Sequence, residues 1–309
     1  MRGKAHWRLR SRTLELGRRT LVMGVVNITP DSFSDGGLFL ASEKAVDHAL
    51  RLIEEGADII DLGAESTRPG SRAGGMSANL QPAVSAEEEQ ERLLPVLEGI
   101  LKSLPHAVVS VDTYKAETAR AALRAGAQIV NDVSGFTWDS AIACVCAEFH
   151  AGVVLSHARG RPDEWRAQPQ LAPDALMATV REGLAASLAA AERAGIQSNA
   201  IVLDPGYGFG KRFDENYVLL ARQAELLALG RPLLAGLSRK SFLGHTLTSL
   251  FGGEPAPTDA RENASLAAMT AAILHGASIV RVHAVRAAVE AARIADAILE
   301  GSEADRATR

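Results

Sequence analysis

Cysteine and aromatic residues are scarce in this chain of 309 residues, which has two cysteines and 5% Phe, Trp and Tyr. Cys144 and Cys146 are two positions apart in a predicted helix, so they face different directions, and neither a disulfide nor a shared metal is expected. Free thiols are consistent with a reducing cytoplasm. The chain also lacks an apolar run of the roughly 18 residues that span a bilayer.

The Arg-rich first twenty residues lack the apolar core of a secretion signal, although an organelle transit peptide stays an alternative. An excess of one charge is missing too, since 33 Lys and Arg stand against 37 Asp and Glu. Neither nucleic acid nor a membrane is therefore expected as a partner. We expect a soluble, cytoplasmic protein.

Eight short apolar runs rich in Val, Ile and Leu alternate with longer stretches of helical periodicity. The runs are 21–27, 59–63, 108–111, 128–130, 152–155, 201–203, 232–237 and 278–282, and the clearest helical stretches are 43–55, 115–125, 174–194 and 284–300. Runs that are apolar on both faces are typical of a buried parallel sheet with helical crossovers. Five glycines predict helix C-caps shortly before a strand: Gly56, Gly126, Gly195, Gly230 and Gly276.

This pattern predicts an α/β fold, a (β/α)₈ TIM barrel with an N-terminal β-hairpin. The hairpin occupies residues 1–20, the barrel 21–300, and a frayed polar tail 301–309. Within the hairpin, Trp7 and Leu9 belong to the first strand and 14–16 to the second. A doubly wound open sheet is the alternative.

Each apolar run is followed by polar side chains, at the end of the barrel where active sites form. A single Asp in such a place often only caps a helix. Eight strand ends in succession are better explained by an enzyme. The residues are Asn27, Asp61, Asp112, Asn131, His157, Asp204, Ser238 with Lys240, and Arg281 with His283.

The chemistry of these side chains suggests a flat polar substrate and an anion. Asp204 and Asn131 suit the adjacent ring N–H and amine of an aminopyrimidinone, and Lys240 can donate to a ring oxygen or nitrogen. Arg281 and His283, two apart on one strand, are expected to share an anion such as pyrophosphate.

The motifs NITPDSFSDGG (27–37), ESTRPG (65–70), DPGYGFGK (204–211), SRKS (238–241) and RVH (281–283) together resemble the dihydropteroate synthase family. The resemblance extends from about residue 21 to 300. It implies a transferase of the folate pathway, usually a homodimer, that joins 6-hydroxymethyl-7,8-dihydropterin pyrophosphate to p-aminobenzoate. The implied reaction is loss of pyrophosphate, followed by attack of the aniline nitrogen.

The resemblance also implies a role for each matching residue. The pterin site would comprise Asp112, Asn131, Asp204 and Lys240. The pyrophosphate site would comprise Asn27, Thr67, Arg281 and His283, with Asn27 on a Mg²⁺ cofactor. The p-aminobenzoate site would comprise Phe33, Thr67, Arg68, Pro69 and Ser241. The residues assigned to catalysis are Asn27, Asp112, Asp204, Lys240, Arg281 and His283.

Three features depart from the family pattern. Ala284 stands where the family usually has Asp, Ser156 where it has Met, and the loop 69–86 is longer than expected. The Ala284 and Ser156 departures keep a non-catalytic pterin-binding paralogue open as an alternative. A pterin-dependent methyltransferase on the same barrel is a second alternative. The Phe33 loop carries no extra residues, so sensitivity to sulfonamides is expected.

Overall fold

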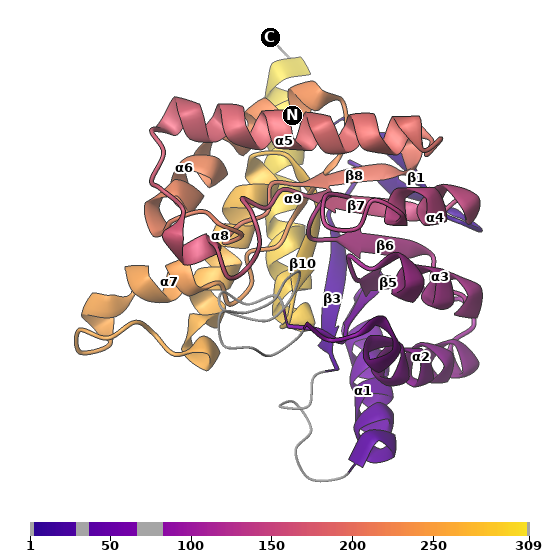
Figure 1. Ribbon diagram of the computed structural model, residues 1–309. Helices are drawn as coiled ribbons and strands as arrows, with labels where there is room; N and C mark the ends of the chain where they lie inside the picture. The colour runs from indigo at the N-terminus through magenta and orange to yellow at the C-terminus, as the bar shows by residue number, and fades with distance from the viewer. Residues whose placement is uncertain (1–2, 29–36, 67–82, 308–309) are drawn as a thin grey trace.

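The computed structural model describes residues 3–28, 37–66 and 83–307, with side chains from 41 onward in the second range and up to 302 in the third. In the described chain, eight parallel strands form a closed barrel in the order β10-β3-β4-β5-β6-β7-β8-β9 (Figure 1). Their bounds are β3 (Leu21–Asn27), β4 (Ile59–Gly63), β5 (Val109–Asp112), β6 (Ile129–Asp132), β7 (Gly152–Ser156), β8 (Ile201–Asp204), β9 (Leu233–Ala235) and β10 (Ala277–Val282). The predicted TIM barrel is confirmed.

Helices between the strands surround the barrel and bury its outer face (Figure 1). They are α1 (Gly37–Glu54), α2 (Ala86–Ser103), α3 (Ala116–Ala125), α4 (Ile142–Glu148), α5 (Pro173–Arg193), α6 (Phe213–Arg222), α7 (Ser241–Thr246), α8 (Glu262–Leu274) and α9 (Val285–Ala307). Short 3₁₀ turns occur at η2 (Trp165–Ala167), η3 (Ser198–Ala200), η4 (Gln223–Leu229), η5 (Thr248–Leu250) and η6 (Thr258–Arg261).

Glycine ends several of these helices as predicted. Gly126, directly after α3, has a φ of 115°, a left-handed conformation that glycine adopts without a Cβ clash. The other four predicted caps also have positive φ. One boundary differs, because the backbone of α9 stays helical to Ala307 where a frayed tail from 301 was expected. No helix in the described ranges is long and apolar enough to cross a membrane.

The predicted N-terminal hairpin is present and closes the amino end of the barrel. Strands β1 (Ala5–Arg8) and β2 (Thr13–Leu16) pair antiparallel. Trp7, Leu9 and Leu16 are at most 1% exposed and pack on the side chains that begin the barrel strands. The Trp7 indole also donates a hydrogen bond of 2.9 Å to the carbonyl of Ala200. Hairpin side chains therefore fill the end of the barrel opposite the pocket described below.

The pairing register of the parallel strands aligns their carboxyl ends. Asp112 on β5 pairs with Gly63 on one side and with Asn131 of β6 on the other. Ser156 on β7 pairs with Asp204 of β8. Polar residues that are far apart in sequence therefore meet at the carboxyl end of the barrel.

Candidate active site

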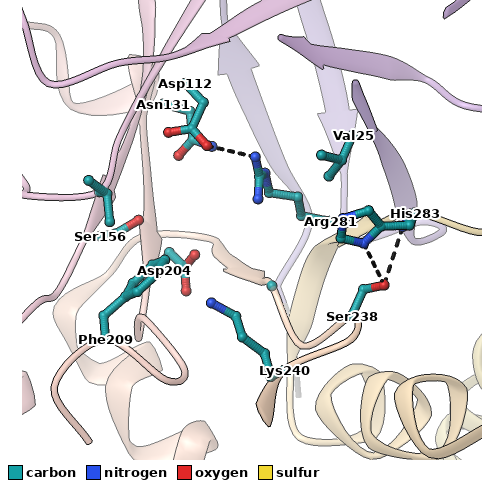
Figure 2. A pocket seen from close by; sticks show the side chains of 12 residues that line it. Val25, Asp112, Asn131, Ser156, Asp204, Phe209, Ser238, Lys240, Arg281 and His283 are labelled. Atoms are coloured by element: carbon teal, nitrogen blue, oxygen red, sulfur yellow. Dashed lines mark hydrogen bonds and ion pairs between the residues drawn. The ribbon is translucent and has the colours of Figure 1, made fainter. Parts of the chain in front are cut away.

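A cavity opens at the carboxyl end of the barrel (Figure 2). It gathers six of the predicted residues: Asp112, Asn131, Asp204, Lys240, Arg281 and His283. Its remaining lining comes from Val25, Val133, Ser156, Phe209, Gly236 and Ser238. Acidic and basic side chains thus face one another across a small space.

Arg281 is held between two carboxylates. Its Nε donates to Oδ2 of Asp61 at 2.6 Å, and its Nη2 donates to Oδ2 of Asp112 at 2.7 Å, the second contact being drawn in Figure 2. Burial lowers the pKa of Arg281, but the two carboxylates outweigh it and raise that pKa overall. Arg281 therefore enters the cavity as a guanidinium already oriented by acids.

Asp112, the second carboxylate that contacts Arg281, has a raised pKa. Burial raises the pKa of Asp112 to about 7, Arg281 acts against this shift, and the nearby negative charge of Asp61 reinforces it. The carboxyl group of Asp112 is thus poised close to neutral pH.

Asp204 is positioned by the loop that follows β8. Its Oδ1 accepts a hydrogen bond of 2.7 Å from the backbone N–H of Gly206. Burial raises the pKa of Asp204, while Gly206 and Lys240 oppose the rise. Gly206 has a φ of 71°, and a Cβ there would overlap the carbonyl oxygen of His157. Glycine is therefore required for this close approach of two loops.

Lys211 stabilises the same loop through hydrogen bonds to its backbone. Its buried ammonium donates to the carbonyl oxygens of His157 and Gly206, both at 2.8 Å, and of Phe209 at 3.3 Å. Phe209 in turn lies under Lys240, whose Nζ is 3.8 Å from the ring centroid. Burial lowers the pKa of Lys240 to about 8, although Asp204 opposes the shift.

His283 pairs with Ser238 at the other side of the cavity (Figure 2). The two side chains are 2.9 Å apart at Nδ1 and Oγ, and Oγ also accepts the backbone N–H of His283 at 3.3 Å. The Ser238 hydroxyl can donate to Nδ1 or accept from it, so this contact orients the His283 ring without fixing its tautomer.

The structure does not place every predicted residue on the cavity. Asn27 is exposed at the end of β3 and Ser241 is exposed at the start of α7, and neither is among the lining residues. Phe33, Thr67, Arg68 and Pro69 lie outside the described residues, as does most of the loop 69–86. Across the described ranges no group of three or more His, Cys, Asp and Glu side chains could hold a metal.

Sequence reasoning assigned no role to two residues that shape the site. Asp61 and Ser238 were recognised only as polar strand ends, and the structure shows them holding Arg281 and His283. Their position after an apolar run was the available indication. Their partners could not be read from it.

The two departures from the family pattern have distinct surroundings. Ser156 is 2% exposed and lines the cavity. Ala284 directly precedes α9, where its carbonyl accepts the N–H of Ala288, so Ala284 is the N-cap residue. An alanine cannot cap, but the carboxylate of Glu55 accepts the N–H of Arg286 at 3.4 Å. Glu55 thus takes over part of that capping role.

A closed barrel with an ionisable pocket at the carboxyl ends of its strands is the architecture of a TIM-barrel enzyme. A model of the family described as pterin binding enzyme matches residues 23–283. The chain belongs to this family of pterin-binding enzymes, and its relatives include many dihydropteroate synthases.

The dihydropteroate synthase of Escherichia coli K12 is 41% identical over 282 residues, which are 91% of this chain and 93% of the relative. The mitochondrial folate synthesis bifunctional protein of Pisum sativum is 40% identical over 299 residues, and the chain spans 55% of its length.

Dihydropteroate synthase from Xanthomonas albilineans has been solved with 4-aminobenzoic acid and with 7,8-dihydropteroate. The first structure has a TM-score of 0.82 at 40% identity, and the match covers 96% of this chain and 99% of that one. The second has a TM-score of 0.78 at 38% identity, with 95% and 98% covered.

Proposed function

We propose that the protein is a dihydropteroate synthase, which joins 6-hydroxymethyl-7,8-dihydropterin pyrophosphate to p-aminobenzoate and releases pyrophosphate. The names of its relatives and the ligands of the X. albilineans structures support this reaction. The observation that carries it is the cavity itself, where Asp204 and Asn131 stand opposite the cations of Lys240 and Arg281.

The pterin ring would bind through its donor edge. A ring N–H beside an exocyclic amine presents two neighbouring donors, which require acceptors when water is removed. The Asp204 carboxylate and the Asn131 amide are buried acceptors on the cavity wall. Lys240 would donate to an oxygen or nitrogen of the ring from above Phe209.

The reaction would proceed by separation of charge. The C–O bond to pyrophosphate breaks with both electrons leaving on the anion, and a cation remains on the pterin methylene carbon. The aniline nitrogen then forms the C–N bond with its lone pair and loses a proton. Arg281 and His283 would stabilise the anion, and the carboxylates of Asp112 and Asp204 would favour the cation.

The proposal includes Mg²⁺, carried by the pyrophosphate. Asn27, the last residue of β3, offers one neutral, exposed oxygen. That donor suits Mg²⁺, which commonly takes one or two protein oxygens and completes its shell with phosphates and water. The bound ion would reduce the negative charge on the leaving pyrophosphate. We assign the p-aminobenzoate site to Phe33, Thr67, Arg68, Pro69 and Ser241 as before.

A homodimer in the cytoplasm is part of the proposal. On α9, Ile294 is 64% exposed and Ile298 is 52% exposed, and residues four apart share one helix face. Such an apolar face supports association of two copies. Light scattering at micromolar protein should give about twice the 32.7 kDa chain mass. A mass equal to that of one chain contradicts the dimer. The two cysteines are unpaired, as is usual in a reducing compartment.

The deciding experiment measures pyrophosphate release from the pterin substrate with Mg²⁺, with and without p-aminobenzoate. Release that yields dihydropteroate and stops with a sulfonamide supports the synthase. Asp204→Ala and Lys240→Ala should each lose at least about a hundredfold in rate. Near-normal turnover in both variants contradicts the site. Binding without release favours a non-catalytic pterin-binding protein, and methyl transfer from methyltetrahydrofolate favours a methyltransferase.

A further inference from the structure

Asp61 lies behind the cavity wall and connects three strands. It is 0% exposed on β4 and is not among the lining residues. Its Oδ2 accepts two hydrogen bonds, from Arg281 Nε at 2.6 Å and from Asn131 Nδ2 at 3.0 Å. Its Oδ1 has no hydrogen-bond partner in the part of the chain that the structure describes. Both of these hydrogen bonds thus come from residues that line the cavity.

The contact with Asn131 determines what that amide can offer. An ionised carboxylate has only acceptors, whereas an amide has both a donor and an acceptor end. The Asn131 NH₂ group must therefore face Asp61. Because the two polar atoms of an amide diverge from one carbon, the Asn131 carbonyl oxygen turns away from Asp61. Asn131 lines the cavity, and with its NH₂ group held by Asp61 its carbonyl oxygen is the acceptor that it can turn to a ligand there.

We propose that Asp61 is a specificity-determining positioning residue, which holds Asn131 as a hydrogen-bond acceptor and so selects ring systems with a donor edge. This inference rests on the proposed function, because it assigns the selection of the pterin ring to the same cavity. Asp61 acts through Asn131 and does not itself line the pocket. Without it, the amide of Asn131 has no fixed direction.

An isosteric exchange tests this role, and it changes both contacts of Asp61, because the same Oδ2 accepts from Asn131 and from Arg281. In Asp61→Asn, the new amide can donate to the Asn131 oxygen and leave the Asn131 NH₂ facing the ring. In the double variant Asp61→Asn with Asn131→Asp, residue 131 has only acceptors whichever way it turns. The exchange keeps the number of carboxylates and the side-chain shapes unchanged.

Calorimetry on the full chain would measure binding of 6-hydroxymethyl-7,8-dihydropterin pyrophosphate. Asp61→Asn should weaken binding about ten- to hundredfold, the effect of opposing two donors in a buried site. The double variant should recover part of that loss, the remainder reflecting the acceptor that Arg281 Nε has lost. Ser110→Ala is the matched control, because Ser110 is the register partner of Asp61, is 0% exposed, and has an Oγ without a partner in the described chain. It should bind like the wild type.

Unchanged binding by Asp61→Asn, or a double variant as weak as the single one, overturns the inference. If Asp61→Asn does not fold by circular dichroism, the double variant is compared with the wild type, and binding weaker by about a hundredfold or more overturns the inference. A ligand-free readout is the side-chain NH₂ resonance of Asn131, assigned by its loss in Asn131→Asp. We expect it to be protected from exchange in the wild type and unprotected in Asp61→Asn, and equal exchange overturns the inference. A wild type with the protected resonance but no pterin binding contradicts the proposed function instead.

Discussion

Lys240 makes the proposed reaction sensitive to alkaline pH. Burial lowers its pKa to about 8, so the ammonium is present below that pH and is lost above it. With this pKa, about nine-tenths of Lys240 is charged at pH 7 and about one-tenth at pH 9. If only the charged form binds the pterin, kcat/KM should fall roughly tenfold between these two values.

The assay is steady-state pyrophosphate release at saturating p-aminobenzoate, from pH 6 to pH 10. Since burial raises the pKa of Asp112 to about 7, its carboxylate disappears as the pH falls, and an acidic limb should appear below neutrality. The two limbs together give a narrow bell with its maximum between about 7 and 8.

Lys240→Arg is the matched control, because a guanidinium keeps its charge to pH 10. The variant should be slower, yet its alkaline limb near pH 8 should be absent. Dividing the two profiles removes any ionisation of the substrates. A wild-type profile that is flat to pH 9.5, or an identical limb in Lys240→Arg, would refute the reasoning.

Three further predictions concern the scaffold. Trp7→Ala should destabilise the fold by about 3–5 kcal/mol in chemical unfolding, because the fully buried indole leaves a cavity and a lost hydrogen bond, and a smaller loss than 1 kcal/mol contradicts this. Glu55→Ala should lower the free energy of unfolding by about 0.5–1 kcal/mol, because the N–H of Arg286 loses its acceptor. Adding Ala284→Asp should restore this loss by capping α9 directly. If the effects of the two substitutions simply add, the two residues do not share the capping role. Gly206→Ala should abolish pterin binding in calorimetry, since its Cβ would overlap the His157 carbonyl, and normal affinity excludes the tight loop contact.

The strand ends could be predicted from the sequence, but their pairing could not. Asp204 and Lys240 follow apolar runs whose residue types already indicate buried strands. Arg281 was expected to bind an anion with His283, yet its Nε and Nη2 are engaged by Asp61 and Asp112. Asp61 and Arg281 are 220 positions apart, and only closure of the barrel brings them together.

Local polarity was a poor guide at the last helix. Residues 301–307 are polar, which indicated fraying, but Ala, Glu and Arg are good helix formers and α9 continues through them. Ser241 was assigned to a binding site by its motif, and it is exposed at the start of α7, where that assignment stays a prediction. A motif gives residue types, whereas the direction of each side chain depends on where the helix begins.

The packing of Trp7 at the amino end of the barrel has a consequence for synthesis on the ribosome. Its indole is bonded to Ala200, so the contact joins residues 193 positions apart. At elongation rates of about 5–20 residues per second, about 10–40 s pass between the synthesis of Trp7 and that of Ala200. During that interval a large apolar side chain has no docking place and is available to chaperones. Early in synthesis the hairpin is thus a hazard for aggregation, although it later becomes a stabilising part of the finished barrel.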